Sequence, residues 1–209
     1  MDQYLLNDPQ IEISLNTLAD EHDAIAQALT LVGYPKARYR DASFETLARI
    51  IVGQQVSVKA AASIAAKLAS ALSGELSADG VMLSSDETLR GAGLSRQKVV
   101  YIRALSAAVL SGELDLLALH NLSDAEAIAA ITAIKGFGVW SAQMYLMFAL
   151  GRLDIWPVGD LAVRGGFARI VGQTDRLTDK QVAAAGAIYS PHRSALALLC
   201  WKYYSDAPL

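Results

Sequence analysis

The chain has 209 residues, of which 53% are hydrophobic, and its 18 basic and 21 acidic side chains leave a net charge of -3. A single cysteine, Cys200, excludes a disulfide framework or a cysteine-ligated cluster within one chain. Taken alone, the acidic balance argues against a nucleic-acid partner, because binding to phosphates usually requires a basic surface. Helix N-termini weaken that argument, since their backbone N–H groups bind phosphate without adding formal charge.

The sequence lacks the marks of a secreted or membrane protein. It does not start with a basic segment followed by an apolar run, and no apolar stretch is long enough to span a bilayer without a charge or a glycine. We therefore expect a cytoplasmic protein without a membrane partner.

Apolar residues at helical spacing, bounded by capping residues and glycines, predict helices joined by short loops. In chain order the expected helices cover residues 20–32, 43–53, 58–72, 84–91, 95–110, 127–134, 139–151 and 161–171, followed by two more after Thr178 and Ser190. Three Ser or Thr residues stand three positions before Glu or Gln, the spacing of a capping box: Ser84 with Glu87, Ser123 with Glu126, and Thr178 with Gln181. Ser190-Pro191 is expected to place proline at the first position of the last helix.

No stretch shows the sustained β-branched alternation of a strand, so the expected fold class is all-α. The chain has no low-complexity linker, which favours a single domain or two interlocked helical lobes.

The segment Lys135-Gly136-Phe137-Gly138 joins two predicted helices without a spare residue. Glycines at such a corner allow a positive φ or the close approach of another chain, and the sequence leaves both reasons open. Because Gly138 has no side chain to cap the next helix, its first N–H groups would form an anion site suited to a DNA phosphate. An isolated Gly-x-Gly is, however, more often only a tight turn.

Asp160 precedes the helix expected over residues 161–171 and follows a loop containing proline and glycine. From its position alone, a helix cap is the more frequent role of such an aspartate. The positive end of the helix dipole would favour a negative charge there.

Five ordered blocks resemble the helix-hairpin-helix (HhH-GPD) DNA glycosylases, in particular their 3-methyladenine DNA glycosylase II branch. The blocks run from about Ser43 to Trp201 and cover residues 51–61, 93–98, 134–142, 156–160 and 191–201. The resemblance implies two helical lobes with a cleft between them, acting as one glycosylase unit over residues 1–209. It places one lobe at about 40–150, with the hairpin, and builds the other from the N-terminal helix and about 151–209.

This resemblance makes Asp160 the expected catalytic carboxylate, which would stabilise the positive charge that develops on the sugar. Related enzymes that also cut the strand place a lysine after the second hairpin glycine, where this chain has Trp140. Others hold an iron–sulfur cluster with four cysteines, and this chain has only Cys200. A monofunctional enzyme without a cofactor is therefore implied, using water as the nucleophile. A monovalent cation at the hairpin carbonyls with DNA bound is left open.

A damaged base must be turned out of the duplex into a pocket, where aromatic faces would hold it. A cationic base such as 3-methyladenine is attracted to an indole face. The candidate pocket residues are Trp140, Trp201, Tyr145, Met144, Trp156 and Gln54. For Trp156 core packing is an equal alternative, and Met144 stands where some relatives have an aromatic residue.

The resemblance also implies double-stranded DNA with damaged bases as the partner of a monomer. Gln55 matches the residue that fills the gap left by the flipped base, with a solvated loop residue as the alternative. The expected DNA contacts are Lys135, Gly136, Phe137, Gly138, Gln55, Ser57, Lys59, Arg96, Lys98 and Arg164. Lone basic residues on helices are more often only solvated.

Three classes of function remain open at this point. The first is release of alkylated bases such as 3-methyladenine and 7-methylguanine, or of uracil, hypoxanthine or oxidised guanine. The second is a non-catalytic module that binds damaged DNA. The third is a helical protein-interaction domain, which only the acidic pI of about 5.6 favours.

Overall fold

The structure is a computed structural model that describes residues 4–207, and these residues form helices and loops without a strand. The predicted all-α class is therefore confirmed. The helices are α1 (Asp8–Glu21), α2 (Asp23–Val32), α3 (Phe44–Gly53), α4 (Val58–Ala71), α5 (Ala78–Leu83), α6 (Asp86–Gly91), α7 (Arg96–Ser111), η1 (Ala118–Asn121), α8 (Asp124–Thr132), α9 (Val139–Phe148), α10 (Leu161–Ile170), α11 (Asp179–Gly186), η2 (Ala187–Tyr189) and α12 (Arg193–Asp206). Within residues 4–207, no helix has the length and apolar character needed to cross a bilayer.

The chain divides into two compact units, labelled unit 1 and unit 2 below. Unit 1 comprises residues up to Tyr39 and from Leu146 onward, and unit 2 comprises Arg40–Tyr145. The action of both as one glycosylase unit with a cleft stays a prediction.

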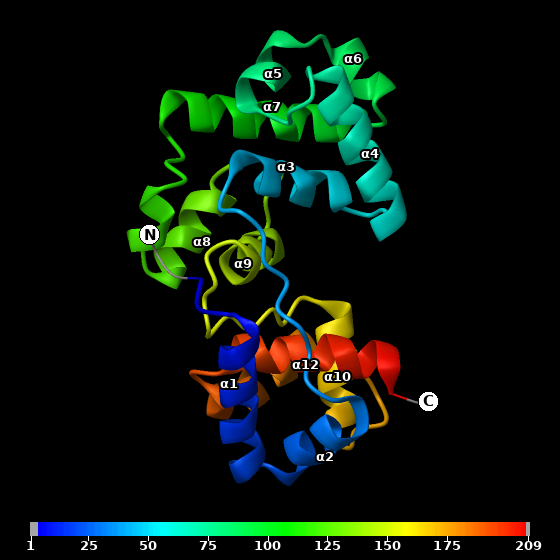
Figure 1. Ribbon diagram of the computed structural model, residues 1–209, viewed down its shortest axis with the longest axis vertical. Helices are drawn as coiled ribbons and strands as arrows, with labels where there is room; N and C mark the ends of the chain where they lie inside the picture. Colours follow the sequence, from blue (N-terminus) through cyan, green and yellow to red (C-terminus); the bar gives the residue numbers. More distant parts are fainter. Residues whose placement is uncertain (1–3, 208–209) are drawn as a thin grey trace. The chain divides into compact units, whose positions relative to one another are not determined.

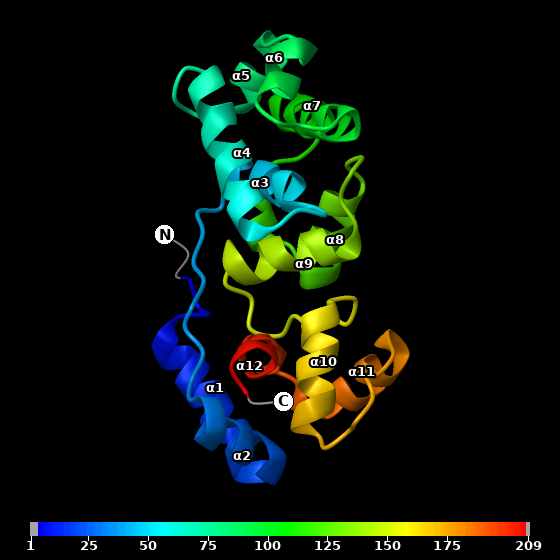
Figure 2. The same ribbon diagram turned by 90° about the vertical axis from the view of Figure 1, so that its right-hand side faces the viewer.

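Unit 1 is organised around α12, which contacts α1, α2 and α10 (Figure 2). Every residue from Ser194 to Cys200 is buried, so this helix is covered on all sides rather than on one stripe. Leu15, Ile25 and Phe167 complete the core from the surrounding helices. Such a central helix can hold a side chain at its end in a fixed position.

Unit 2 packs α7 against α3 and α5, with α4 beside α3 (Figure 1). Its α3 begins where predicted, because the Ser43 hydroxyl accepts a hydrogen bond from the Thr46 N–H. Leu47 and Ile51, one turn apart on α3, are fully buried with Ile102 of α7. The amphipathic stripe seen in the sequence is therefore the core face of α3.

Several helix boundaries differ from the prediction, and α1 and α5 were not predicted. Two of the differences lie at a false capping signal. The helix expected over residues 20–32 is broken at His22, whose extended backbone separates α1 from α2. The predicted capping box of Ser84 with Glu87 is wrong. Ser84 ends α5, while Ser85 caps α6 by accepting from the Thr88 N–H at 3.1 Å.

Proline does not open the last helix. α12 begins two residues later, at Arg193, because the loop before α10 accepts its first N–H groups. The Arg193 N–H donates to Asp154 Oδ1, and the Ser194 N–H donates to the Leu153 carbonyl. The two capping boxes at Ser123 and Thr178 are confirmed.

Candidate functional site

Asp160 caps α10 and is bound at the same time by an indole from another helix. Its Oδ1 atom accepts hydrogen bonds from the Ala162 and Val163 N–H groups, both at 2.9 Å. The same atom accepts from Nε1 of Trp201 at 3.0 Å. The cap suggested by its position is therefore real, and it fixes the carboxylate in one orientation.

Two glycines allow α12 to bring Trp201 to Asp160. A Cβ atom at Gly166 would overlap the backbone carbonyl of Cys200, and one at Gly165 would lie 2.6 Å from the Tyr204 ring. α10 and α12 therefore cross at close range, as Figure 2 shows. Burial, and secondarily the Asp160 charge, raises the pKa of the Cys200 thiol, so this cysteine stays protonated beside the site.

The Trp201 ring already has a cation on it. The Arg38 guanidinium carbon lies 5.2 Å from the ring centroid, and Phe148 packs at 5.8 Å between centroids. Electrostatic attraction between a guanidinium and the indole quadrupole explains the first contact. This indole is therefore placed where it can attract a positive charge close to a carboxylate.

An ion pair that the sequence reading did not single out anchors the loop before α10. Arg193 forms a two-pronged bond with Asp154, at 2.7 Å from Nε to Oδ1 and 2.7 Å from the second nitrogen to Oδ2. The buried Ser194 hydroxyl accepts from the Ile155 N–H and donates to the Arg152 carbonyl. Asp154 lies outside the sequence blocks, and no local signal pairs it with a residue 39 positions away.

Trp156 belongs to the core of unit 1, which corrects its expected place in a base pocket. Its Nε1 donates to the Val182 carbonyl at 2.9 Å, and its ring packs edge-on against Phe167 at 5.5 Å. Because its one donor is bound to the backbone and the ring is buried, core packing is the role that the structure supports.

The two hairpin glycines of unit 2 have different structural requirements. Gly136 has a φ of 103°, and a Cβ atom there would overlap the Tyr101 ring, so the fold requires glycine. Gly138 has no positive φ and nothing within 4 Å of an added Cβ. Neither a positive φ nor a close contact among the described residues requires glycine at position 138, and a side chain there would meet open space.

Phe137 lies between these glycines, and the structure corrects its expected DNA contact. Its ring is buried, and its N–H donates to the Ile134 carbonyl at 3.1 Å. Neither group is therefore available to a ligand. Lys135 next to it is exposed, in keeping with its expected contact.

The predicted pocket residues of α9 differ in exposure. Trp140 is 40% exposed, whereas Met144 and Tyr145 are buried. The Tyr145 hydroxyl has no hydrogen-bond partner among the described residues, and burial raises its pKa. Trp140 is therefore partly accessible to a ligand, while Met144 and Tyr145 pack inside the protein; a pocket role for all three stays a prediction.

Two of the expected phosphate contacts serve the fold instead. Nζ of Lys98 donates to the backbone carbonyls of Val52 and Gln54, and burial lowers its pKa. Nε of Arg164 donates to the Leu177 carbonyl at 2.8 Å and ties α10 to the loop before α11. Lys59 and Arg96 are exposed and stay predicted contacts.

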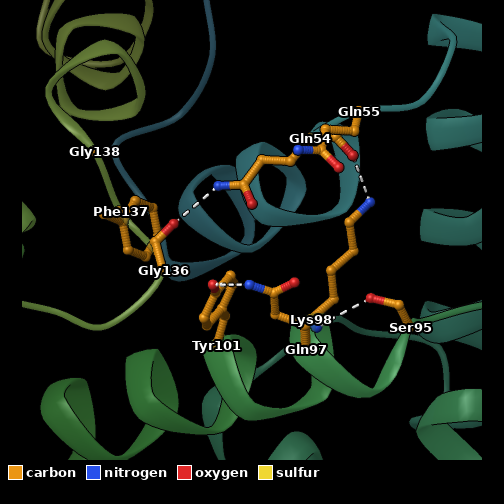
Figure 3. Close-up of a pocket in the computed structure, with 9 residues that line it drawn as sticks. All are labelled: Gln54, Gln55, Ser95, Gln97, Lys98, Tyr101, Gly136, Phe137 and Gly138. Atoms are coloured by element: carbon orange, nitrogen blue, oxygen red, sulfur yellow. Dashed lines mark hydrogen bonds between the residues drawn. The ribbon is translucent and has the colours of Figure 1, made fainter.

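One hollow of unit 2, beside the hairpin, brings together Gln54 of the predicted pocket and several of the predicted DNA contacts (Figure 3). The hollow has a volume of about 320 Å³ and is lined by Gln54, Gln55, Ser95, Gln97, Lys98, Tyr101, Gly136, Phe137 and Gly138. Nε2 of Gln54 donates to the Gly136 carbonyl at 2.9 Å. This carbonyl belongs to the hairpin, where a monovalent cation with DNA bound is left open. Gln55 and Ser57 are exposed, and the Ser57 hydroxyl caps α4.

The sequence matches the family described as HhH-GPD superfamily base excision DNA repair protein over residues 48–191. The chain belongs to this superfamily. It is also 31% identical over 162 residues to DNA-3-methyladenine glycosylase 1 of Schizosaccharomyces pombe, which covers 76% of this chain and 71% of that protein. The predicted superfamily and its 3-methyladenine branch are thereby confirmed.

Solved HhH-GPD structures agree with the fold. The S. pombe 3-methyladenine DNA glycosylase in complex with abasic DNA superposes with a TM-score of 0.82 at 29% identity, covering 92% of this chain and 95% of that one. A DNA-3-methyladenine glycosidase from Bacillus halodurans gives a TM-score of 0.82 at 32% identity, covering 92% and 89%.

Two further features of the site concern its chemistry. The residue two positions after Gly138 is Trp140, which carries no amine that could form a Schiff base. Within residues 4–207, no group of His, Cys, Asp and Glu side chains is arranged to hold a metal ion.

Proposed function

We propose that the protein is a monofunctional DNA glycosylase of base excision repair that hydrolyses the bond between deoxyribose and an alkylated base. The observation that carries the proposal is the Asp160 carboxylate, fixed by two backbone N–H groups and the Trp201 indole in an HhH-GPD chain. The relatives named 3-methyladenine glycosylases support this assignment.

In the proposed reaction the glycosidic bond breaks with its electron pair moving to the base. A purine alkylated at N3 or N7 is cationic, so it leaves as a neutral base without needing a proton from the enzyme. The sugar becomes positively charged, and the Asp160 carboxylate stabilises that charge. Water then adds to the anomeric carbon and loses a proton, which yields an abasic site. Water is the only co-reactant, so we propose that no cofactor takes part.

The charge of the leaving base is also what the indole recognises. In the free protein a guanidinium already lies over the Trp201 ring, 5.2 Å from its centroid. A methylated purine offers the same combination of a flat surface and a positive charge. This favours alkylated bases over uracil and hypoxanthine, which carry no positive charge and leave either as an anion or after protonation.

We further propose duplex DNA containing such a base as the partner of a single copy of the protein. The complex of the S. pombe relative with abasic DNA supports this proposal. The open space at Gly138 gives the phosphate backbone room to approach the start of α9.

The test is a substrate panel with the wild-type protein and the Asp160→Asn variant. Duplex DNA treated with a methylating agent, and duplexes with a single uracil or hypoxanthine, are incubated and the released bases quantified. We expect 3-methyladenine and 7-methylguanine to be released by the wild type, with strands that break only after alkali. A wild type as inactive as Asp160→Asn would refute catalysis, and damaged-DNA affinity without release would favour the binding module.

A further inference from the structure

The turn that follows α3 carries Gln55 in an unusual backbone conformation. Gln55 has a φ of 57°, in the left-handed region that costs a residue with a side chain about 1 kcal/mol or more. Its side chain is exposed. Such a conformation persists only where the surroundings hold it. The contacts of the neighbouring residues therefore decide whether Gln55 keeps its left-handed backbone conformation.

Lys98 supplies the first of these contacts. Its Nζ atom reaches from α7 to the end of α3 and donates to the carbonyls of Val52 and Gln54, at 2.8 Å and 2.7 Å. Carbonyls in the last turn of a helix lack donors within the helix, and a cation there also suits the dipole. The ammonium therefore binds the backbone on both sides of Gly53, directly before Gln55.

Gln54 supplies the second contact and connects the turn to the hairpin. Its Nε2 atom donates to the Gly136 carbonyl at 2.9 Å. Gly136 lies against the ring of Tyr101, which is one helical turn after Lys98 on α7 and is itself bonded to Gln97. Figure 3 shows these side chains facing one another around the hollow. The turn, the hairpin and α7 are thus joined pairwise within unit 2.

We propose that Lys98 is a positioning residue for turning the damaged base out of the duplex. Its ammonium holds the Gln54–Gln55 turn in the conformation described above, with Gln55 left-handed and exposed, so that Gln55 enters the gap in the base stack. Gln54 links that turn to the corner that receives the phosphate, so both meet the DNA as one rigid piece. This inference rests on the proposed function and adds a residue that acts through the turn rather than on the DNA.

The first experiment examines the free protein, so its outcome does not depend on glycosylase activity. Lys98→Met removes the N–H donors to the Val52 and Gln54 carbonyls while keeping a side chain of similar length. Lys98→Arg supplies N–H donors again. Arg96→Met is the matched control, because it removes an exposed cation two residues away on the same helix. We expect amide hydrogen exchange at residues 53–57 to rise about tenfold in Lys98→Met only. Unchanged exchange in a folded Lys98→Met protein would overturn the proposal.

The second experiment measures whether Gln55 enters the base stack. A duplex with a tetrahydrofuran abasic site opposite 2-aminopurine reports unstacking as a rise in fluorescence at saturating protein. Both methionine variants should lose DNA affinity in a salt-dependent way, because each removes one positive charge. Only Lys98→Met should lose most of the fluorescence rise and about tenfold in kcat, with Lys98→Arg recovering both. Equal losses in Lys98→Met and Arg96→Met would reduce Lys98 to an ordinary phosphate contact.

Discussion

Helices α9 and α10 both begin after a short loop that contains glycine, and both direct backbone N–H groups and a positive dipole end out of their first turn. At α10 the side chain of Asp160 fills that position and accepts two of the N–H groups. At α9 the preceding residue is Gly138, which has no side chain and open space around it. The same helical feature therefore holds an internal carboxylate in one unit and leaves room for an external anion in the other.

The largest effect is expected from separating the two roles of Asp160. Asparagine still accepts from the backbone N–H groups, whereas alanine does not, and neither carries a charge. We expect both variants to lose about 10²- to 10³-fold in single-turnover base release, by loss of charge stabilisation. Only Asp160→Ala should also lose about 1 kcal/mol in the free energy of unfolding, measured with urea. An Asp160→Asn protein within a few-fold of wild-type activity would contradict the catalytic role.

Trp201→Phe tests the third donor to the carboxylate while keeping an aromatic ring. The hydrogen bond from Nε1 to Asp160 is lost. A bond to a charged acceptor contributes about 1.5–3 kcal/mol, so we expect base release to slow by about tenfold or more. The loss should shrink in the Asp160→Asn background, because the two residues act as a unit. Additive losses in the double variant would show that the indole acts independently of Asp160.

Gly138→Asp would make the start of α9 resemble that of α10. The open space accepts the side chain, and the carboxylate would take the position expected for a phosphate and repel it. We expect DNA affinity to fall about three- to tenfold at low salt, measured by fluorescence anisotropy. Gly138→Asn is the control, since it caps the helix without a charge. An equal loss in both variants would point to steric blocking rather than charge.

The smallest effect concerns the loop that leads to Asp160. Hydrogen bonds from Arg193 and Ser190 outweigh the effect of burial and lower the pKa of Asp154 below its ordinary value of 3.8. A carboxylate with a lowered pKa stabilises the fold above that ordinary value, and the stabilisation is lost as the pH falls through the folded-state pKa. Asp154→Asn should therefore cost about 1 kcal/mol at neutral pH and less in acid. Urea unfolding at pH 7 and pH 3 measures this difference, and an equal cost at both would exclude the ion pair as its source.

The sequence by itself determined the helices that begin at strong local signals. Each of these helices is capped by a side chain that accepts from backbone N–H groups only two or three residues away, which needs no tertiary contact; these caps are Ser43, Ser57, Ser95 and Asp160. The same locality explains the error at Ser84, because the adjacent Ser85 offers an equal cap; in the structure Ser85 caps α6, and the Ser84 carbonyl accepts a hydrogen bond from Arg103.

Only the tertiary structure decided what the candidate residues do. For Trp156 the sequence left core packing and a pocket role equally open; in the structure its indole donates to a core carbonyl, whereas that of Trp201 donates to Asp160. Lys98 could be distinguished from Arg96 only by its reach to the end of α3, 46 residues away in the chain. Gly136 and Gly138 differ in that Gly136 has a positive φ and lies against the ring of Tyr101, whereas Gly138 has neither feature. Such contacts depend on how distant helices pack, and no local pattern encodes that packing.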